Sequence, residues 1–292
     1  MATILTSIPS PGANTLELGP LTFNAYGLMI ALGVMAAVLL SSKRLEARGG
    51  NPEVISSIAL VAVPAGLVGA RLYHVLTDWQ RFRGNWGDVY KVWEGGLGIP
   101  GGMALGIVAG IWVAKRKGLD VPTLLDVVAP ALPLAQAIGR VGNWFNQEIV
   151  GGPTDLPWAL EIDEANRPAE FLNEPTFHPT FLYEALWNLA LVAVLLRVDR
   201  SGKLKRGRLI WLYVFGYGLG RLWIEAIRSD EASIVLGLRV NIWLSLALII
   251  SGGIALMGAR SDDSLEDKVT LEDEMAETDA DEVVPDEADA DV

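Results

Sequence analysis

The chain has 292 residues, of which 51% are hydrophobic, and it carries a formal net charge of −12 with no cysteine. The lack of cysteine excludes disulfide bridges, thiolate metal sites and a cysteine nucleophile within the protein. Residues 261–292 hold fifteen acidic residues and one lysine, whereas residues 1–260 hold 20 acidic and 22 basic residues. We expect this acidic tail to be disordered, because it has few apolar residues and repels itself. A partner-binding arm is the alternative.

Seven apolar segments follow one another along residues 1–260, and each approaches the roughly 20 residues that a membrane helix needs. They are residues 25–40, 54–75, 95–114, 121–138, 179–196, 209–227 and 240–259. Asp126, Pro130 and Pro133 interrupt the fourth segment, and the first extends back to Leu18 in an alternative reading. The pattern predicts an all-α membrane protein, a bundle of about seven transmembrane helices.

The basic residues of the connections are divided unevenly between the two sides of this bundle. The connections after the first, third, fifth and seventh segments hold thirteen Lys and Arg, against six on the opposite side. Because basic loops stay in the cytoplasm, the N-terminus is expected outside and the acidic tail inside. The longest connection, residues 139–178, then forms a small extracytoplasmic lobe. The N-terminus lacks the pattern of a cleavable signal peptide, so the first helix is expected to direct insertion.

Polar residues from five separate segments fall in the outer layer of the bundle once the direction of each span is assigned. Ionisable residues inside membrane spans are costly and mark function or buried pairing. The residues in this layer are Tyr26, Arg71, Tyr73, His74, Arg140, Asn143, Asn146, Glu148, His178, Tyr183, Glu184, Tyr217, Arg221, Glu225 and Arg228. Their coincidence predicts one shared site at the outer end.

Residue spacing supports this site. Tyr217, Arg221 and Glu225 are four residues apart, so they form one stripe along a helix, and Arg140 and Asn143 share a face if their helix continues. Two arginines from different helices suit an anionic head group, since guanidinium groups bind phosphate with two parallel hydrogen bonds and keep their charge.

Structural roles compete with this functional interpretation. Arg221 and Glu225 form a buried ion pair in one alternative, and Arg140 reaches the membrane interface in another. Glu184 orients an arginine, and His178 is a hydrogen-bonded structural residue. A structural role is also favoured for Asp126, which lies toward the inner end of its span.

The glycine-rich run at residues 95–102 fits neither phosphate-loop pattern, and no strand precedes it. Close helix packing or an irregular turn that lines a cavity explains such a run in a membrane bundle.

Residues 139–151, Gly-Arg-Val-Gly-Asn-Trp-Phe-Asn-Gln-Glu-Ile-Val-Gly, resemble the signature of the bacterial prolipoprotein diacylglyceryl transferase family. Further matches span roughly residues 20–258 and leave out the tail: Tyr26 to Met29, Gly69 to Tyr73, Gly95 to Leu97, His178 and Pro179, Leu182 to Glu184, Tyr217 and Gly218, Arg221, Glu225 and Arg228. One position departs: many members have a histidine where this chain has Pro100, so a histidine base is absent there.

The resemblance implies transfer of the diacylglyceryl group of phosphatidylglycerol to the lipobox cysteine of a prolipoprotein. The products are a thioether and glycerol phosphate, and the reaction occurs at the outer face of the bacterial inner membrane. No cofactor, metal or nucleic acid is expected. The resemblance implies that Arg140 binds the head group, that Arg221 is the second essential arginine, and that further residues shape the site or line its cavity: Asn143, Asn146, Glu148, Gly151, Tyr26 and Tyr217.

We count Tyr26 and Glu184 with Arg140 and Arg221 as catalytic, and Arg71 and His178 as substrate-binding. The arginines would hold the phosphodiester, stabilise the departing charge and lower the pKa of the attacking thiol. Glu184, His178 and a phosphate oxygen of the substrate are equal candidates for a base. The main rival function is a transporter for a small anion, which predicts polar residues along the whole membrane depth.

Overall fold

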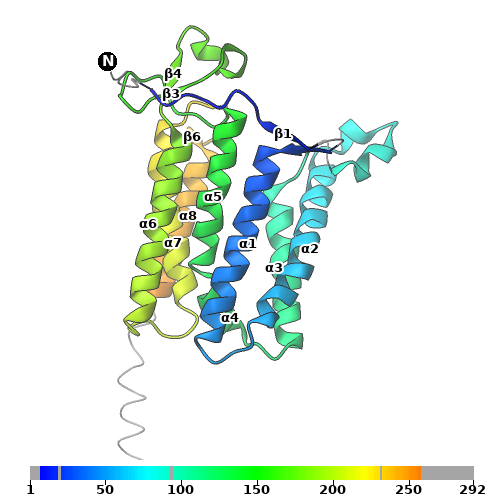
Figure 1. The fold of residues 1–292 in the computed structure, drawn as a ribbon, viewed down its shortest axis with the longest axis vertical. Helices are drawn as coiled ribbons and strands as arrows, with labels where there is room; N and C mark the ends of the chain where they lie inside the picture. The colour runs from blue at the N-terminus through cyan, green and yellow to red at the C-terminus, as the bar shows by residue number, and fades with distance from the viewer. Residues whose placement is uncertain (1–6, 19–20, 93–94, 231, 258–292) are drawn as a thin grey trace, which may run out of the picture.

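The computed structural model describes residues 7–18, 21–92, 95–230 and 232–257, so the acidic tail lies outside the described residues. The α-helices form one bundle (Figure 1). They are α1 (Ala25–Glu46), α2 (Glu53–Thr77), α3 (Ile99–Arg116), α4 (Val121–Val128), α5 (Ala131–Asn146), α6 (Thr180–Arg200), α7 (Leu209–Ile227) and α8 (Val240–Met257). Short antiparallel hairpins join β1 (Thr15–Leu18) to β2 (Leu21–Asn24), β3 (Leu160–Glu161) to β4 (Thr176–Phe177), and β5 (Ile234–Val235) to β6 (Leu238–Arg239).

The predicted helical membrane fold is confirmed. Among the described residues, five helical segments are long and apolar enough to cross a membrane: α1, α2, α4 with α5, α6 and α8. Helices α3 and α7 lie alongside them in the same bundle (Figure 1). The break between α4 and α5 falls at Ala129 and Pro130, where the sequence predicted an interruption.

Three predicted helix limits are corrected. Asn24 caps α1 by accepting a hydrogen bond from the Tyr26 backbone, and the β1–β2 hairpin precedes it, so the extension back to Leu18 is wrong. Helix α3 starts at Ile99 rather than at residue 95, because Gly95 and Gly96 adopt φ of +87° and +72°. Helix α5 continues to Asn146, so the lobe comprises residues 147–179 and not 139–178.

Helices α2 and α3 pack backbone to backbone through glycines. A Cβ atom at Gly69 would lie 2.7 Å from the Leu105 Cβ, and one at Gly66 would lie 3.3 Å from the Gly102 carbonyl oxygen. Small residues allow such approach between membrane helices. The predicted packing role of the glycine-rich run is therefore confirmed for its second half.

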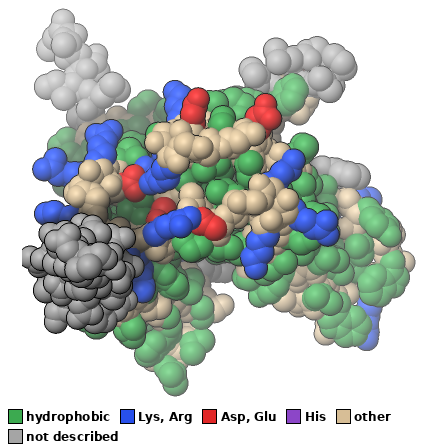
Figure 2. Space-filling model, turned by 90° about the horizontal axis from the view of Figure 1, so that it is seen from below, with side chains coloured by type: hydrophobic (Ala, Val, Ile, Leu, Met, Phe, Trp, Pro, Cys, Tyr) green, Lys and Arg blue, Asp and Glu red, His purple; other side chains and the backbone are tan. Residues whose placement is uncertain are grey.

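The end of the bundle at α4 is closed by a buried polar network. The Asp126 carboxylate accepts hydrogen bonds from the backbone N–H groups of Gly207 (2.6 Å) and Leu209 (3.0 Å). Arg44 donates to the carbonyl oxygens of Asp126 and Val127. Asp126 thus caps the start of α7, which confirms its predicted structural role. Many Lys and Arg side chains gather on this face (Figure 2).

At the opposite end, residues 147–179 form a lobe with its own small apolar core of Val150, Leu160, Ile162 and Phe177. The β3–β4 hairpin lies within the lobe above α5 and α6 (Figure 1). The N-terminal segment contributes Ile8, which forms a bridge with Leu160, and Trp144 donates to the Pro9 carbonyl oxygen. These contacts tie the lobe to the helices that carry the polar residues.

Candidate functional site

Arg140 of α5 and Arg221 of α7 meet at one carboxylate, that of Glu184 on α6. Arg140 Nη2 forms an ion pair with Oε2 of Glu184, and Arg221 Nη1 lies 3.5 Å from Oε1. The side chains are shielded from solvent, with exposed fractions of 20% for Arg140, 12% for Arg221 and 5% for Glu184. The sequence placed these three residues in one layer, and the structure brings them into contact.

A polar chain runs from Arg140 to the C-terminal end of α5. Arg140 Nη1 donates to the Asn143 side-chain oxygen at 3.1 Å, and Asn143 donates to Glu148 Oε1 at 2.8 Å. Asn146 donates to the same oxygen at 3.2 Å. Gln147 ends the helix in a left-handed conformation, and this turn folds Glu148 back onto Asn143. The predicted site residues of this segment therefore form one network.

A second polar chain runs from Arg221 to the C-terminal end of α7. Arg221 Nη2 lies 2.8 Å from Glu225 Oε2, and the fully buried Glu225 also accepts from Arg239 at 2.6 Å. Arg228 and Arg239 both pair with Asp230, at 2.6 and 3.4 Å. Burial raises the pKa of Asp230, but the hydrogen bonds and charge of Arg228, with the charge of Arg239, hold that pKa below its ordinary value. The predicted Arg221–Glu225 pair is thus part of a larger cluster.

Both chains end in the walls of one cavity of about 1140 Å³, here called the outer cavity. Its walls come from the end of α5 and the start of the lobe, from the lobe segment 166–171, and from the α7–α8 connection. Its lining includes Asn146, Glu148, Ala169, Arg228, Asp230 and Arg239.

Three further predicted site residues lie near the arginines and make other kinds of contact. The Tyr26 ring lies against α5, so a Cβ at Gly142 would be 2.7 Å from it. Tyr217 lines a small cavity together with Arg221 and Glu184. Gly151 pairs with Arg228 through the backbone, where a Cβ would lie 2.6 Å from the His178 Cβ.

Among the described residues, the hydrogen-bond partners of the Arg71 and His178 side chains lie outside the arginine pair. Arg71 donates to four carbonyl oxygens of the loop after α2, those of Asp88, Val89, Gly95 and Gly96. Within the described residues, the His178 ring bonds with the Tyr183 hydroxyl at 3.2 Å, and that hydroxyl accepts from Trp158. The sequence predicted the end of the bundle at which these two residues lie, but it did not predict their hydrogen-bond partners.

The sequence reading missed Arg239 and Asn241 as members of the cluster, although both donate to Glu225 Oε1. Arg239 lies on the short strand β6 and Asn241 in the first turn of α8. A basic residue just before an apolar span, such as Arg239, is common at the membrane interface. Its position in the sequence therefore did not indicate that it belongs to the cluster. The buried Glu225, which needs neutralising partners, was the available hint.

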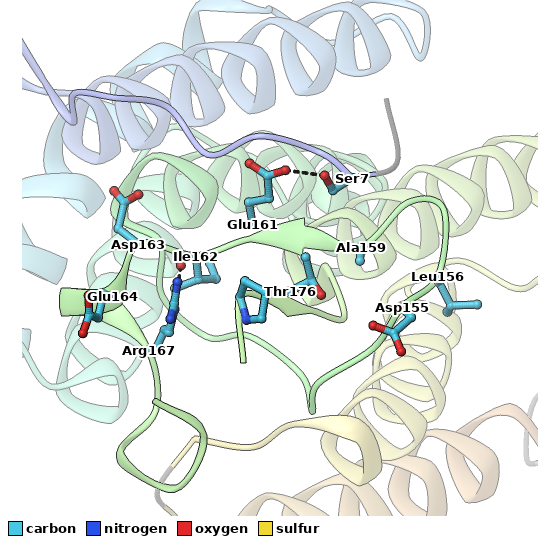
Figure 3. Close-up of a pocket in the computed structure, with 11 residues that line it drawn as sticks. Ser7, Asp155, Leu156, Ala159, Glu161, Ile162, Asp163, Glu164, Arg167 and Thr176 are labelled. Carbon is cyan, nitrogen blue, oxygen red and sulfur yellow. Dashed lines mark hydrogen bonds between the residues drawn. The ribbon is translucent and has the colours of Figure 1, made fainter. Parts of the chain in front are cut away.

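A second cavity of about 550 Å³ lies in the lobe. Figure 3 shows the carboxylates of Asp155, Asp163 and Glu164 around it, with Glu161 bonded to Ser7. Arg167 is the basic residue of this lining. An excess of carboxylates repels a phosphate group, so this cavity does not suit an anionic head group.

Comparison with known proteins shows the family to which this chain belongs. A family model described as prolipoprotein diacylglyceryl transferase matches residues 13–258. The phosphatidylglycerol–prolipoprotein diacylglyceryl transferase of Streptomyces griseus is 50% identical over 251 residues, which cover 84% of this chain and 75% of the relative. The proteins of that name from Frankia alni and Cutibacterium acnes are 49% and 46% identical; the matches cover 88% and 86% of this chain and 68% and 86% of the relatives. This chain belongs to the prolipoprotein diacylglyceryl transferase family.

Proposed function

We propose that this protein is an enzyme that transfers the diacylglyceryl group of phosphatidylglycerol to the lipobox cysteine thiol of prolipoproteins. The family and the names of its relatives support the reaction. The observation that carries the site is the meeting of Arg140 and Arg221, from different helices, at the Glu184 carboxylate. The comparisons offer no support for the rival transporter.

The arginine pair suits a lipid phosphate because its two guanidinium groups already face the two oxygens of one anion. A phosphodiester likewise presents two non-bridging oxygens, so it can accept hydrogen bonds from guanidinium N–H groups that Glu184 does not engage. Glu184 and Glu225 hold the guanidinium groups in place before lipid arrives. Such preorganised charge stabilises a developing anion more in a shielded site than in water.

The reaction forms one bond and breaks one bond. The thiol sulfur attacks the glycerol carbon next to the phosphate, the carbon–oxygen bond to that phosphate breaks, and glycerol phosphate leaves with the bonding electrons. The thiol proton passes to a base or to a phosphate oxygen. Arg140 and Arg221 orient the carbon toward the sulfur and stabilise the departing phosphate. Because Glu184 is engaged by both arginines, we assign it to positioning these groups.

We further propose seven membrane crossings, with the lobe outside the cell membrane and the α4 end in the cytoplasm. The basic side chains on the α4 face support this orientation, since such residues stay cytoplasmic (Figure 2). Helices α3 and α7 would complete the seven with the five apolar segments. This orientation gives the arginine site access to exported prolipoproteins and to outer-leaflet phosphatidylglycerol in the bacterial inner membrane.

The test is an assay with labelled phosphatidylglycerol and a lipobox peptide in membranes that contain the protein. We expect Arg140→Ala and Arg221→Ala each to abolish thioether formation while the protein stays in the membrane. Arg200→Ala is the matched control, because Arg200 is exposed at the α4 end, and it should retain activity. Normal turnover by either site variant would reject the mechanism.

A further inference from the structure

We propose that the outer cavity binds the segment of the acceptor polypeptide that follows its cysteine. This inference rests on the proposed function and assigns to the cavity a substrate class, an extended peptide outside the apolar layer. It differs from the arginine pair, which is assigned to the lipid phosphate.

The outer cavity lies beyond the ends of the long helices. The walls of the outer cavity begin at Asn146, the last residue of α5, and at Arg228, the residue after α7. The other lining residues belong to loops, to short strands and to two short 3-10 helices of the lobe, Glu164–Asn166 and Ala169–Phe171, all of which lie beyond the long helices. Acyl chains stay within the apolar layer that those helices span. A cavity beyond the helix ends therefore suits the part of a substrate that leaves the membrane.

Side-chain contacts link the walls of the outer cavity to the arginine pair. Arg140 connects through Asn143 to Glu148, and Glu148 lies in the cavity wall. Arg221 connects through Glu225 to Arg239, which lies in the opposite part of the lining. Arg140 and Arg221 do not line the outer cavity, but these two chains of side-chain contacts join its walls to the arginine pair, so a peptide bound in the cavity would contact the network that holds both guanidinium groups.

The lining of the outer cavity is chemically mixed. The walls combine charges of both signs with apolar groups such as Ile149, Phe171 and Ile234. A peptide offers alternating N–H and C=O groups together with side chains, and this mixture matches such walls better than a uniform head group does. The volume of about 1140 Å³ also exceeds the range of about 300–1000 Å³ that small-molecule sites occupy.

The first test narrows the cavity with a bulky side chain. Ala169 lines the cavity and is exposed, whereas Ala165, in the preceding short helix of the lobe, is exposed but does not line it. We expect Ala169→Trp to raise the KM for a lipobox peptide by about tenfold or more and to leave the KM for phosphatidylglycerol unchanged. Ala165→Trp is the control and should change neither constant. A rise in the KM for phosphatidylglycerol alone would overturn the assignment.

The second test does not depend on turnover. Because the chain has no cysteine, Ala169→Cys and Ala165→Cys each create a unique thiol. The probe is a lipobox peptide whose acceptor cysteine is replaced by serine and whose next residues carry a bromoacetyl group. We expect rapid alkylation of Ala169→Cys, slowed by excess unlabelled peptide, and slow alkylation of Ala165→Cys.

Equal alkylation of both variants, or alkylation that unlabelled peptide does not slow, would overturn the peptide site. If Ala169→Cys is alkylated selectively but the protein forms no thioether, the proposed reaction is rejected and the proposed peptide site is kept. The two failures are therefore distinguishable.

Discussion

Arg140 and Arg221 contact opposite oxygens of the same carboxylate, that of Glu184, although they lie on different helices. Two guanidinium groups that contact the same carboxylate carry like charges, and these charges repel each other more strongly in a shielded environment than in water. The carboxylate between them reduces that repulsion and contacts both guanidinium groups. The two guanidinium groups are thus held close together before substrate binds.

We predict that Glu184→Gln lowers kcat/KM for phosphatidylglycerol by about 10²- to 10³-fold, comparable to loss of one preorganised group. The amide presents one oxygen and one N–H group, so it cannot bridge two guanidinium groups. The measurement is the rate of thioether formation across pH. The profile should keep its shape, because Glu184 positions the arginines; activity that returns as pH rises would indicate a base instead. Glu46→Gln, an exposed change at the α4 end, should have no effect.

Arg71 is predicted to hold the loop after α2 rather than the substrate. Its guanidinium group donates to four loop carbonyl oxygens and lies 5.4 Å from the centre of the Phe82 ring. Arg71→Gln should increase hydrogen exchange at residues 88–92 and 95–96, with no direct change in the KM for phosphatidylglycerol. Arg81→Gln, exposed on the same loop, is the control. Unchanged exchange together with a raised KM would return Arg71 to a substrate-binding role.

The α2–α3 contact should tolerate no added methyl group at Gly69. A Cβ there would lie 2.7 Å from the Leu105 Cβ, against a helix backbone that cannot yield easily. We predict that Gly69→Ala lowers the free energy of unfolding by about 1–3 kcal/mol, as measured by thermal unfolding in detergent. Gly253→Ala is the matched helical control, since its nearest neighbour is 3.9 Å away. Equal stability of the two variants would contradict this packing.

We predict that the contribution of Asp230 to the free energy of unfolding is lost as the pH falls. Since its folded-state pKa lies below the ordinary value, its contribution is present above the unfolded pKa of about 3.9 and is lost as pH falls through the folded pKa. The unfolding temperatures of the wild type and Asp230→Asn should therefore differ by a constant amount above about pH 5 and converge below about pH 4. A difference that grows on acidification would contradict the assignment.

Hydropathy predicted most of the fold because membrane helices need long apolar runs. It misplaced the start of α3, since glycines count as mildly apolar while Gly95 and Gly96 adopt left-handed conformations. It also gave no sign of the β1–β2 hairpin, whose four-residue strands are too short to show periodicity. Pro130 and Pro133 did reveal the break between α4 and α5.

For the candidate site, alternating span directions predicted which residues share a depth. Depth placed Arg140, Glu184 and Arg221 in one layer, and their contacts followed because their helices are neighbours. The same argument could not tell which way Arg71 turns about its helix axis, and this direction separates it from the pair. Arg239 remained hidden, because its role depends on the path of a loop.

Helix α1 packs closely on α5, where a Cβ at Gly33 would lie 2.9 Å from the Ala135 carbonyl oxygen, whereas α2 packs on its immediate neighbour α3. During synthesis the α2–α3 pair can therefore assemble as soon as both helices have entered the bilayer. Helix α1 must wait until α5 has been made, and in that interval its small-residue face stays exposed to lipid or to the insertion machinery. The order of translation thus leaves the first helix as one of the later ones to reach its final neighbour.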